Sequence, residues 1–210
     1  MQMVTPRRSN PERSAAMRAR LVAAARRVFV THGYADTGTP AIVAEAGVTR
    51  GALYHHFPDK QAILRAVVEA ESAEVAGAIE AADTSAMSAL ERLLAGAEAY
   101  VHAMEADGRT RLLLVEGPAV LGREEMRRIE AKHGDATLKT GLEELMAKGP
   151  AADLPLDALA SMLSAMFERA AIDVADGVAA ADVLAVLRHI LRGLTTGGPA
   201  PGAGTPFDVT

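Results

Sequence analysis

The chain has 210 residues and a net charge of −5 at pH 7, and half of its residues are apolar, but only 3% are aromatic and none is Cys or Trp. An interior built mainly from Ala, Leu, Val, Ile and Met favours helices over sheets. The absence of Cys excludes disulfide scaffolds, thiolate metal sites and cysteine nucleophiles. No apolar run approaches the roughly 18–20 residues that span a bilayer, and no leucine-rich block follows the first arginines. These features predict a soluble, cytoplasmic protein without a membrane partner.

The charge is distributed unevenly along the chain. Residues 1–60 contain nine Arg or Lys and four acidic residues, whereas residues 61–210 carry a net charge of −10. This asymmetry favours a basic region that binds a polyanion and an acidic remainder that other polyanions avoid. An ordinary arginine-rich helix surface is the alternative explanation at this point.

Four helices are expected in the first part of the chain, from the spacing of apolar residues and from Gly, Pro and capping residues. They cover about 10–32, with Asn10 as N-cap and Pro11 in the first turn; 40–46; 50–57, capped by Thr49; and 59–82, capped by Asp59. Gly47 lies in the tight connection between the second and third helices. A glycine there permits the positive φ and steep helix crossing of a helix-turn-helix.

The third helix divides its side chains between two faces, because residues four apart lie on the same side. Leu53 and Phe57 face the expected core. The outward face carries Arg50, Gly51, Tyr54 and His55. Such a face can approach a groove, donate to phosphates and contact base edges. A solvated helix face is the alternative, but its position after a glycine turn in a basic segment favours nucleic-acid binding.

A longer stretch of residues resembles a known family. Gly33-Tyr34, Ile42, the run Ala46–Phe57 and Asp59-Lys60 resemble the DNA-binding signature of the TetR family over about residues 15–65. The resemblance implies an all-α fold, with a three-helix helix-turn-helix DNA-binding domain in residues 1–60 and a helical ligand-binding and dimerisation domain in residues 61–195, joined by the long fourth helix. It also implies a dimeric transcriptional regulator, most often a repressor, released from a palindromic DNA operator by a small-molecule inducer.

The resemblance also assigns particular residues to DNA. The assigned residues are Thr39, Thr49, Arg50, Gly51, Tyr54, His55 and Lys60. Thr49 and Lys60 are expected to meet phosphates, and a helix N-terminus is a suitable place for an anion. Arg50 is the candidate for a bidentate contact to guanine. The family's usual Ser or Thr before the second helix is Gly38 here, so the phosphate contact falls to Thr37 or Thr39, of which we favour Thr39.

The remaining sequence predicts further helices after Thr84 to Ala106, and over 124–148, 155–176 and 181–194. A short apolar segment, 112–115, is expected to end at Gly117-Pro118. In the last helix, a nearly continuous apolar seam comprises Val183, Leu187, Ile190 and Leu194. By resemblance, the last two helices pair with their copies in a homodimer. The Gly-, Pro- and Thr-rich tail, 196–210, is expected to be disordered.

A small-ligand pocket is expected between the later helices. Its candidate lining is Met104, Leu112, Glu116, Leu145, Met162, Met166 and Phe167. Methionine provides an adaptable apolar lining, although methionines at helical spacing are more often core residues. Glu116 is an acid in an apolar setting, and it either faces the pocket or caps a neighbouring helix. The sequence does not identify the effector.

Catalysis is not predicted. His55 and His56 are adjacent, unlike the four-residue spacing with which two imidazoles on a helix bind one metal. The sequence shows no glycine-rich phosphate loop, nucleophile elbow or distinctive carboxylate pair, so we expect no enzyme activity, metal or cofactor. Two other functions stay open: a ligand-binding or protein-interaction module that has lost DNA binding, and a transcriptional activator.

Overall fold

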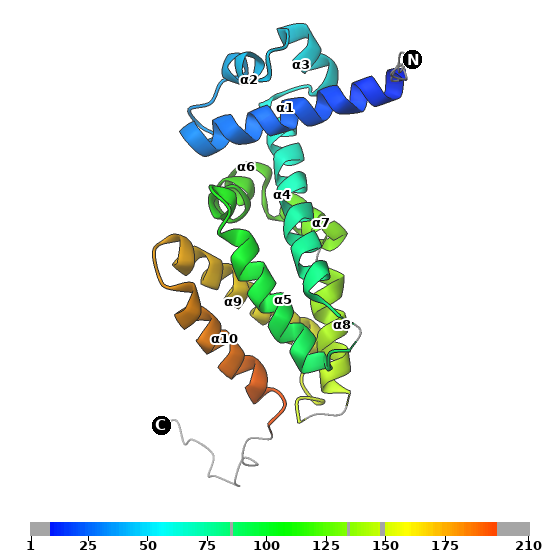
Figure 1. The fold of residues 1–210 in the computed structure, drawn as a ribbon, viewed down its shortest axis with the longest axis vertical. Helices are drawn as coiled ribbons and strands as arrows, with labels where there is room; N and C mark the ends of the chain where they lie inside the picture. The colour runs from blue at the N-terminus through cyan, green and yellow to red at the C-terminus, as the bar shows by residue number, and fades with distance from the viewer. Residues whose placement is uncertain (1–8, 85, 134, 148–149, 197–210) are drawn as a thin grey trace, which may run out of the picture. The chain divides into compact units, whose positions relative to one another are not determined.

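The computed structural model describes residues 9–84, 86–133, 135–147 and 150–196, and within them every regular element is a helix (Figure 1). The all-α prediction is therefore confirmed. The elements are α1 (Asn10–His32), α2 (Thr39–Ala46), α3 (Arg50–His56), α4 (Lys60–Ala82), α5 (Ala89–Met104), the π-helical segment η1 (Arg111–Glu116), α6 (Gly117–Leu121), α7 (Arg123–His133), α8 (Asp135–Met146), α9 (Leu156–Ala175) and α10 (Ala180–Gly193). In these ranges, no helix combines the length and apolarity that a membrane span requires.

Helix α1 begins one residue earlier than the predicted cap implied. Ser9, not Asn10, is the N-cap: its hydroxyl accepts from the Glu12 N–H at 3.4 Å, while the Glu12 carboxylate accepts from the Ser9 N–H at 2.6 Å. This reciprocal capping box satisfies two backbone donors that would otherwise lack helical partners. The predicted end of the helix at His32 is confirmed.

The chain forms two compact units. The first comprises Met1–Glu74 and Ala106–Glu130, and the second comprises Val75–Glu105 and Ala131–Thr210. In the first unit, α1 packs against α2, and large side chains that include Leu21, Phe29 and Ile42 are fully buried. This unit extends beyond the helix-turn-helix to the part of α4 up to Glu74 and to the segment from η1 to Glu130 of α7. The predicted domain division at residue 60 therefore does not coincide with the edge of a compact unit.

In the second unit, α5 packs against α8, α9 and α10. Helix α10 contributes Leu184, Leu187 and Leu191 to the core, whereas Val186 and Ile190 are exposed. The predicted apolar seam is thus divided between an inward and an outward side. Leu184, Leu187 and Leu191 are spaced three and four residues apart and share the inward face, whereas Ile190 lies at the edge of that face and is exposed.

Two predicted boundaries were wrong. Gly117-Pro118 does not end the apolar segment, because η1 continues directly into α6, and Pro118 lies in the first turn of α6. The single helix expected over 124–148 consists of α7 and α8, with their junction at residue 134 outside the described residues. Most of the tail, 197–210, also lies outside them.

Candidate DNA-binding surface

The connection between α2 and α3 is a left-handed glycine turn. Gly47 has φ 59° and ψ 43°, and its N–H donates to the Ala44 carbonyl at 3.1 Å, while the Val48 N–H donates to the Val43 carbonyl at 3.2 Å. These bonds satisfy carbonyls at the end of α2. The Thr49 hydroxyl then accepts from the Ala52 N–H at 3.2 Å and caps α3, as predicted. The turn thereby fixes where α3 begins.

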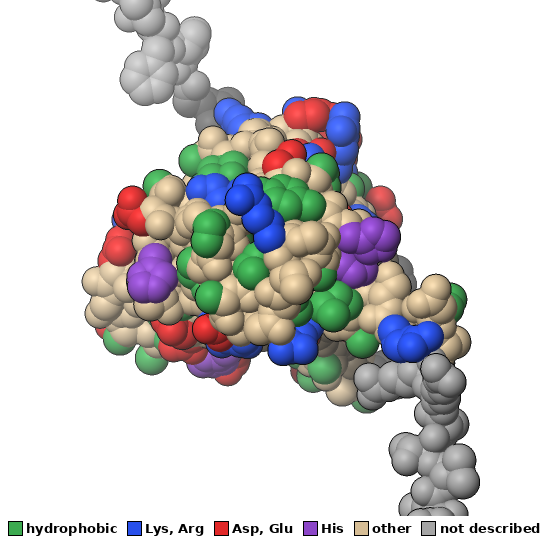
Figure 2. All heavy atoms as spheres, turned by 90° about the horizontal axis from the view of Figure 1, so that it is seen from above, with side chains coloured by type: hydrophobic (Ala, Val, Ile, Leu, Met, Phe, Trp, Pro, Cys, Tyr) green, Lys and Arg blue, Asp and Glu red, His purple; other side chains and the backbone are tan. Residues whose placement is uncertain are grey.

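The structure confirms the predicted division of α3 into two faces. Leu53 and Phe57 are buried in the core of the first unit. The residues predicted on the outward face, Arg50, Gly51, Tyr54 and His55, are all exposed. Burial of the inner side anchors the helix, and the polar side chains of the outer side are left accessible to a groove. Seen from above in Figure 2, acidic side chains lie mostly toward the edges of this end of the molecule.

Three of the predicted DNA-binding residues lie together on this surface. Tyr54 is 41% exposed, its hydroxyl lies 3.5 Å from the Thr39 hydroxyl, and the Arg50 guanidinium lies 5.4 Å from the centre of its ring. The hydrogen bond with Thr39, and then that with Arg50, lower the pKa of the Tyr54 hydroxyl. A guanidinium, a phenol and a hydroxyl from α2 and α3 thus form one polar patch.

The structure separates the roles of the two threonines before α2. Thr37 is only 2% exposed, and its hydroxyl donates to the Gly33 carbonyl at 2.7 Å. It stabilises the loop after α1 and is not available to DNA. Thr39 is partly exposed beside Tyr54, which supports the choice of Thr39 for a phosphate contact.

Lys60 has a placement that the sequence did not predict. Its ammonium donates to the carbonyls of Tyr34 and Thr37 at 2.8 and 3.0 Å and lies 4.1 Å from the centre of the Tyr34 ring. Two of the three ammonium donors are thereby used within the protein. Lys60 holds the loop before α2 against the start of α4, and its phosphate contact stays a prediction.

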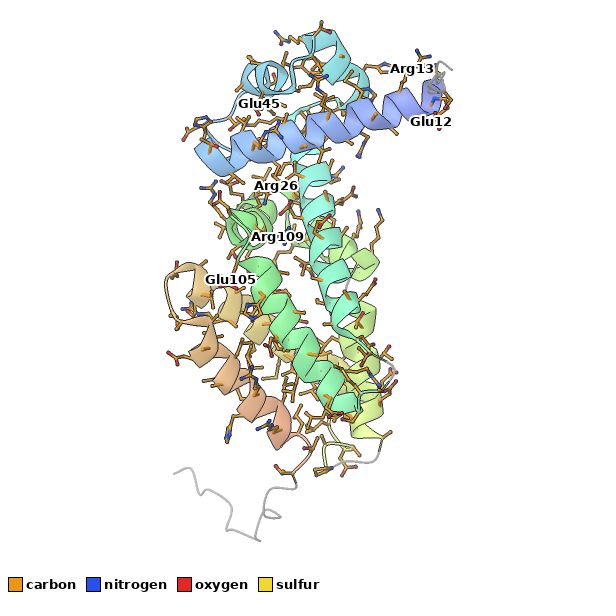
Figure 3. The ribbon with its side chains drawn as sticks, in the orientation of Figure 1. Glu12, Arg13, Arg26, Glu45, Glu105 and Arg109 are labelled. Atoms are coloured by element: carbon orange, nitrogen blue, oxygen red, sulfur yellow. The ribbon has the colours of Figure 1, made fainter. Side chains whose placement is uncertain are left out.

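A buried carboxylate connects three segments of the first unit. Glu71 of α4 is 4% exposed; its oxygens accept from Nε of Arg26 at 2.7 Å and from Nε of Arg109 at 2.8 Å. Arg26 also donates to the Asp107 carbonyl at 3.1 Å. Burial alone would raise the pKa of Glu71, but the hydrogen bonds and charges of the two arginines outweigh it and lower the pKa. Figure 3 labels both arginines.

The π-helical segment η1 contacts the end of α1. Arg111 donates to the carbonyls of Phe29 and Val30, each at 2.7 Å, and Glu116 accepts from the Tyr34 N–H at 3.1 Å. The two ends of η1 therefore bind the last turn of α1 and the loop that follows it. Glu116 was expected to face a pocket or to cap a neighbouring helix. Its observed partners are the loop N–H after α1 and, at 3.5 Å, Nε of Arg111, and its place in a pocket stays a prediction. Sequence patterns gave no signal for these contacts.

The residues proposed to line a pocket lie in both compact units. Leu112 and Glu116 belong to the first unit, and the other five belong to the second. Met162 is 73% exposed, so it lines no pocket within a single chain. Leu145, Met166 and Phe167 are partly buried and pack against the hydrophobic clusters of the second unit, and their place in a pocket stays a prediction. In the described residues, no group of three or more His, Asp or Glu side chains is placed to hold a metal ion.

A basic, exposed helix that follows a glycine turn on a small helical core defines a helix-turn-helix DNA-binding protein. Residues 21–67 match the family model for bacterial regulatory proteins of the tetR family, and residues 90–197 match the tetracyclin repressor-like C-terminal domain. The chain belongs to the TetR family of bacterial regulatory proteins. Members of this family are DNA-binding transcriptional regulators and not enzymes.

Known relatives agree with this assignment. A TetR-family transcriptional regulator from Pectobacterium atrosepticum is 33% identical, with a TM-score of 0.70 over 90% of this chain and 98% of that one. The transcriptional activator FasR of Mycolicibacterium smegmatis is 31% identical over 49% of this chain, and the transcriptional regulator SrpR of Pseudomonas putida is 47% identical over 24%. The matches span only 47% of the length of FasR and 24% of the length of SrpR.

Proposed function

We propose that this protein is a repressor that binds a palindromic operator as a dimer and leaves it when a small-molecule inducer binds. The observation that supports this most is the outward face of α3, where Arg50, Tyr54 and the neighbouring Thr39 form an exposed polar patch. None of these three side chains has an acidic partner in the described part of the chain. Binding to operator DNA would place the protein in the cytoplasm.

On DNA, the α3 helices of the two subunits would enter successive major grooves. Arg50 would read a guanine, since its guanidinium can donate two bonds to one base edge. Thr39 and Thr49 would meet phosphates, Gly51 would allow close approach of the backbone, and Tyr54 and His55 would contact the groove. Two-fold symmetry then requires half-sites about 34–36 Å apart, or a small multiple of that distance.

The dimer would form through the last two helices. Met162 of α9 and Val186 and Ile190 of α10 are 73%, 59% and 39% exposed. Large apolar side chains exposed on two helices that contact each other favour an interaction surface over a solvated one. We expect Val186→Glu to produce a monomer in analytical ultracentrifugation, whereas Glu80→Ala, an exposed change on α4, leaves the dimer intact. A Val186→Glu protein that remains dimeric would exclude α10 as the interface.

Release by the inducer requires a preference between two states. Suppose that 99% of the dimers can bind DNA without the inducer and only 1% can bind it with the inducer. The inducer must then bind the state that cannot bind DNA about 10⁴-fold more tightly than the other state, a difference of roughly 5.5 kcal/mol. The loop before α2 is held by Lys60 of α4 and by Glu116 of η1, at 2.8 and 3.1 Å. A ligand that shifts either element would therefore move α2 and the polar patch beside it.

Selection from a pool of random duplexes tests the proposal. We expect enrichment of a palindrome whose half-sites have the spacing given above, with binding that weakens when either half is scrambled. If no sequence is enriched over the starting pool, the chain is not an operator-binding regulator, and a ligand-binding or interaction module becomes the better explanation.

Activation of transcription is the second candidate function, because the relative FasR is named an activator. DNA contacts do not distinguish the two outcomes, which depend on where the operator lies relative to the promoter. A reporter fused to the enriched operator and its native promoter distinguishes them. Deletion of the regulator raises reporter expression for a repressor and lowers it for an activator.

A further inference from the structure

Helix α1 carries three arginines at intervals of seven residues: Arg13, Arg20 and Arg27. Seven residues make almost two full turns of an α-helix, so these side chains leave the helix on the same flank, about 10 Å apart along its axis. The buried residues Leu21, Ala25 and Phe29 lie on a different side of α1. The arginines therefore form one basic flank next to the core.

Only one of the three is neutralised by the fold. Nε of Arg27 lies 2.6 Å from the Glu45 carboxylate of α2. Arg13 and Arg20 are exposed, and among the described residues neither has an acidic partner. The neighbouring Glu12 is engaged in the capping box with Ser9, and Figure 3 shows Glu12 and Arg13 on different sides of the first turn.

Arg20 lies directly at the helix-turn-helix. A Cβ placed on Gly47 would stand 2.9 Å from Nη2 of Arg20, so the guanidinium occupies the space that the glycine leaves open. Gly47 is two residues before Thr49, the cap of α3. Arg20 thus borders the end of α3 from which Arg50 projects, and Arg13 extends the same flank away from the turn.

We infer that Arg13 and Arg20 form a phosphate-binding edge that holds the DNA backbone beside the groove entered by α3. The guanidinium suits this role because its planar fork can donate two parallel bonds to a phosphate. Phosphate contacts position a protein on the duplex but carry no sequence information, so this edge adds affinity and register rather than specificity. The inference rests on the proposed function.

Salt titration of DNA binding tests this edge. The probes are a duplex from the upstream region of the protein's own gene and a random duplex of equal length. For Arg13→Ala or Arg20→Ala, we expect the slope of log affinity against log salt to become shallower by about 0.9 per bound protomer, and by about twice that in the double variant. The loss of affinity should be the same factor on both duplexes.

Two controls make the result specific. Arg123→Ala removes an exposed arginine from the start of α7 and should leave the slope unchanged. Arg20→Lys keeps the charge and should retain most of the slope, which a merely structural role for the arginine would not explain. Thermal melting followed by circular dichroism establishes that each variant is folded.

The outcomes separate the edge from the proposed function. If the wild-type protein binds both duplexes and the double variant keeps the wild-type slope, the edge does not exist although the regulator does. If Arg20→Ala weakens only the specific duplex, Arg20 reads bases and the phosphate assignment is overturned. If the wild-type protein binds neither duplex at low salt, both proposals fail.

Discussion

Helix α1 uses its arginines in opposite ways on two flanks. On one flank, Arg26 binds the buried Glu71 carboxylate at 2.7 Å and helps to hold α1 against α4. On the other, Arg20 lies exposed over the turn at Gly47 without an acidic partner in the described residues. The two side chains are chemically identical and six residues apart. The group that the fold places opposite each arginine therefore decides whether it stabilises the protein or remains available to DNA.

The largest expected effect on stability comes from removing the Glu71 carboxylate, to which Arg26 binds. Glu71→Ala leaves Arg26 and Arg109 without their shared partner in a largely buried site, and breaking such a pair costs about 3–5 kcal/mol of unfolding free energy. Urea unfolding measures the loss. Glu74→Ala removes an exposed carboxylate from the same helix and should change stability by no more than about 0.5 kcal/mol. Equal effects of the two variants would mean that the Glu71 cluster contributes little.

The direct comparison of the two flanks uses Arg26→Ala and Arg20→Ala. Hydrogen bonds to charged groups contribute about 1.5–3 kcal/mol, so Arg26→Ala should lower the unfolding free energy by about that amount. Arg20→Ala should lower it by less than about 0.5 kcal/mol, since it removes no ion pair. In DNA binding the order should reverse, with a shallower salt dependence only for Arg20→Ala. Loss of stability in both variants would remove the distinction between the flanks.

The turn beneath Arg20 gives the next effect. Gly47→Ala introduces a side chain at φ 59° and against Arg20, and a non-glycine residue in this left-handed conformation costs roughly 1–2 kcal/mol. Gly77→Ala is the matched control on α4, where an added Cβ meets nothing within 4 Å. There the better helix propensity of Ala should stabilise the protein by up to about 1 kcal/mol. In thermal unfolding, we expect a lower midpoint than that of the wild-type protein for Gly47→Ala and a higher midpoint for Gly77→Ala.

The smallest predicted effect is a pH dependence. The pKa of Glu71 is lowered in the folded protein, so its ionised form stabilises the fold above the pKa of the unfolded chain. That contribution is lost as the pH falls through the folded pKa. The stability difference between the wild-type protein and Glu71→Gln should therefore narrow as the pH falls. A difference that stays constant down to acid pH would show that the fold does not lower the pKa of the Glu71 carboxyl.

The sequence predicted the helix-turn-helix well because its signals are local. Gly47, the Thr49 cap and the four-residue spacing of Leu53 and Phe57 all act within one or two turns of chain. In the Glu71 cluster, Arg26 lies 45 positions from Glu71 in the sequence and Arg109 lies 38 positions from it. No spacing rule predicts contacts between residues so far apart. The outward placement of Ile190 also depends on which neighbours cover α10 rather than on the apolar pattern alone.

The sequence also does not show which arginines the fold pairs with an acidic residue. Arg13, Arg20 and Arg26 all contributed equally to the basic N-terminal region in the sequence. The identity of the pocket lining was similarly beyond the sequence, because methionines at helical spacing in a core and in a cavity look alike. Leu145, Met166 and Phe167 belong to the packed clusters of the second unit.

The central claim, that the accessible side of α3 recognises DNA, is tested most directly by the affinity of Arg50→Ala for the selected operator and for a random duplex at one salt concentration. We expect an additional loss of about 1–3 kcal/mol on the operator relative to the random duplex, together with relaxed preference at one base pair of each half-site. An equal loss on both duplexes, or no loss on either, would contradict it.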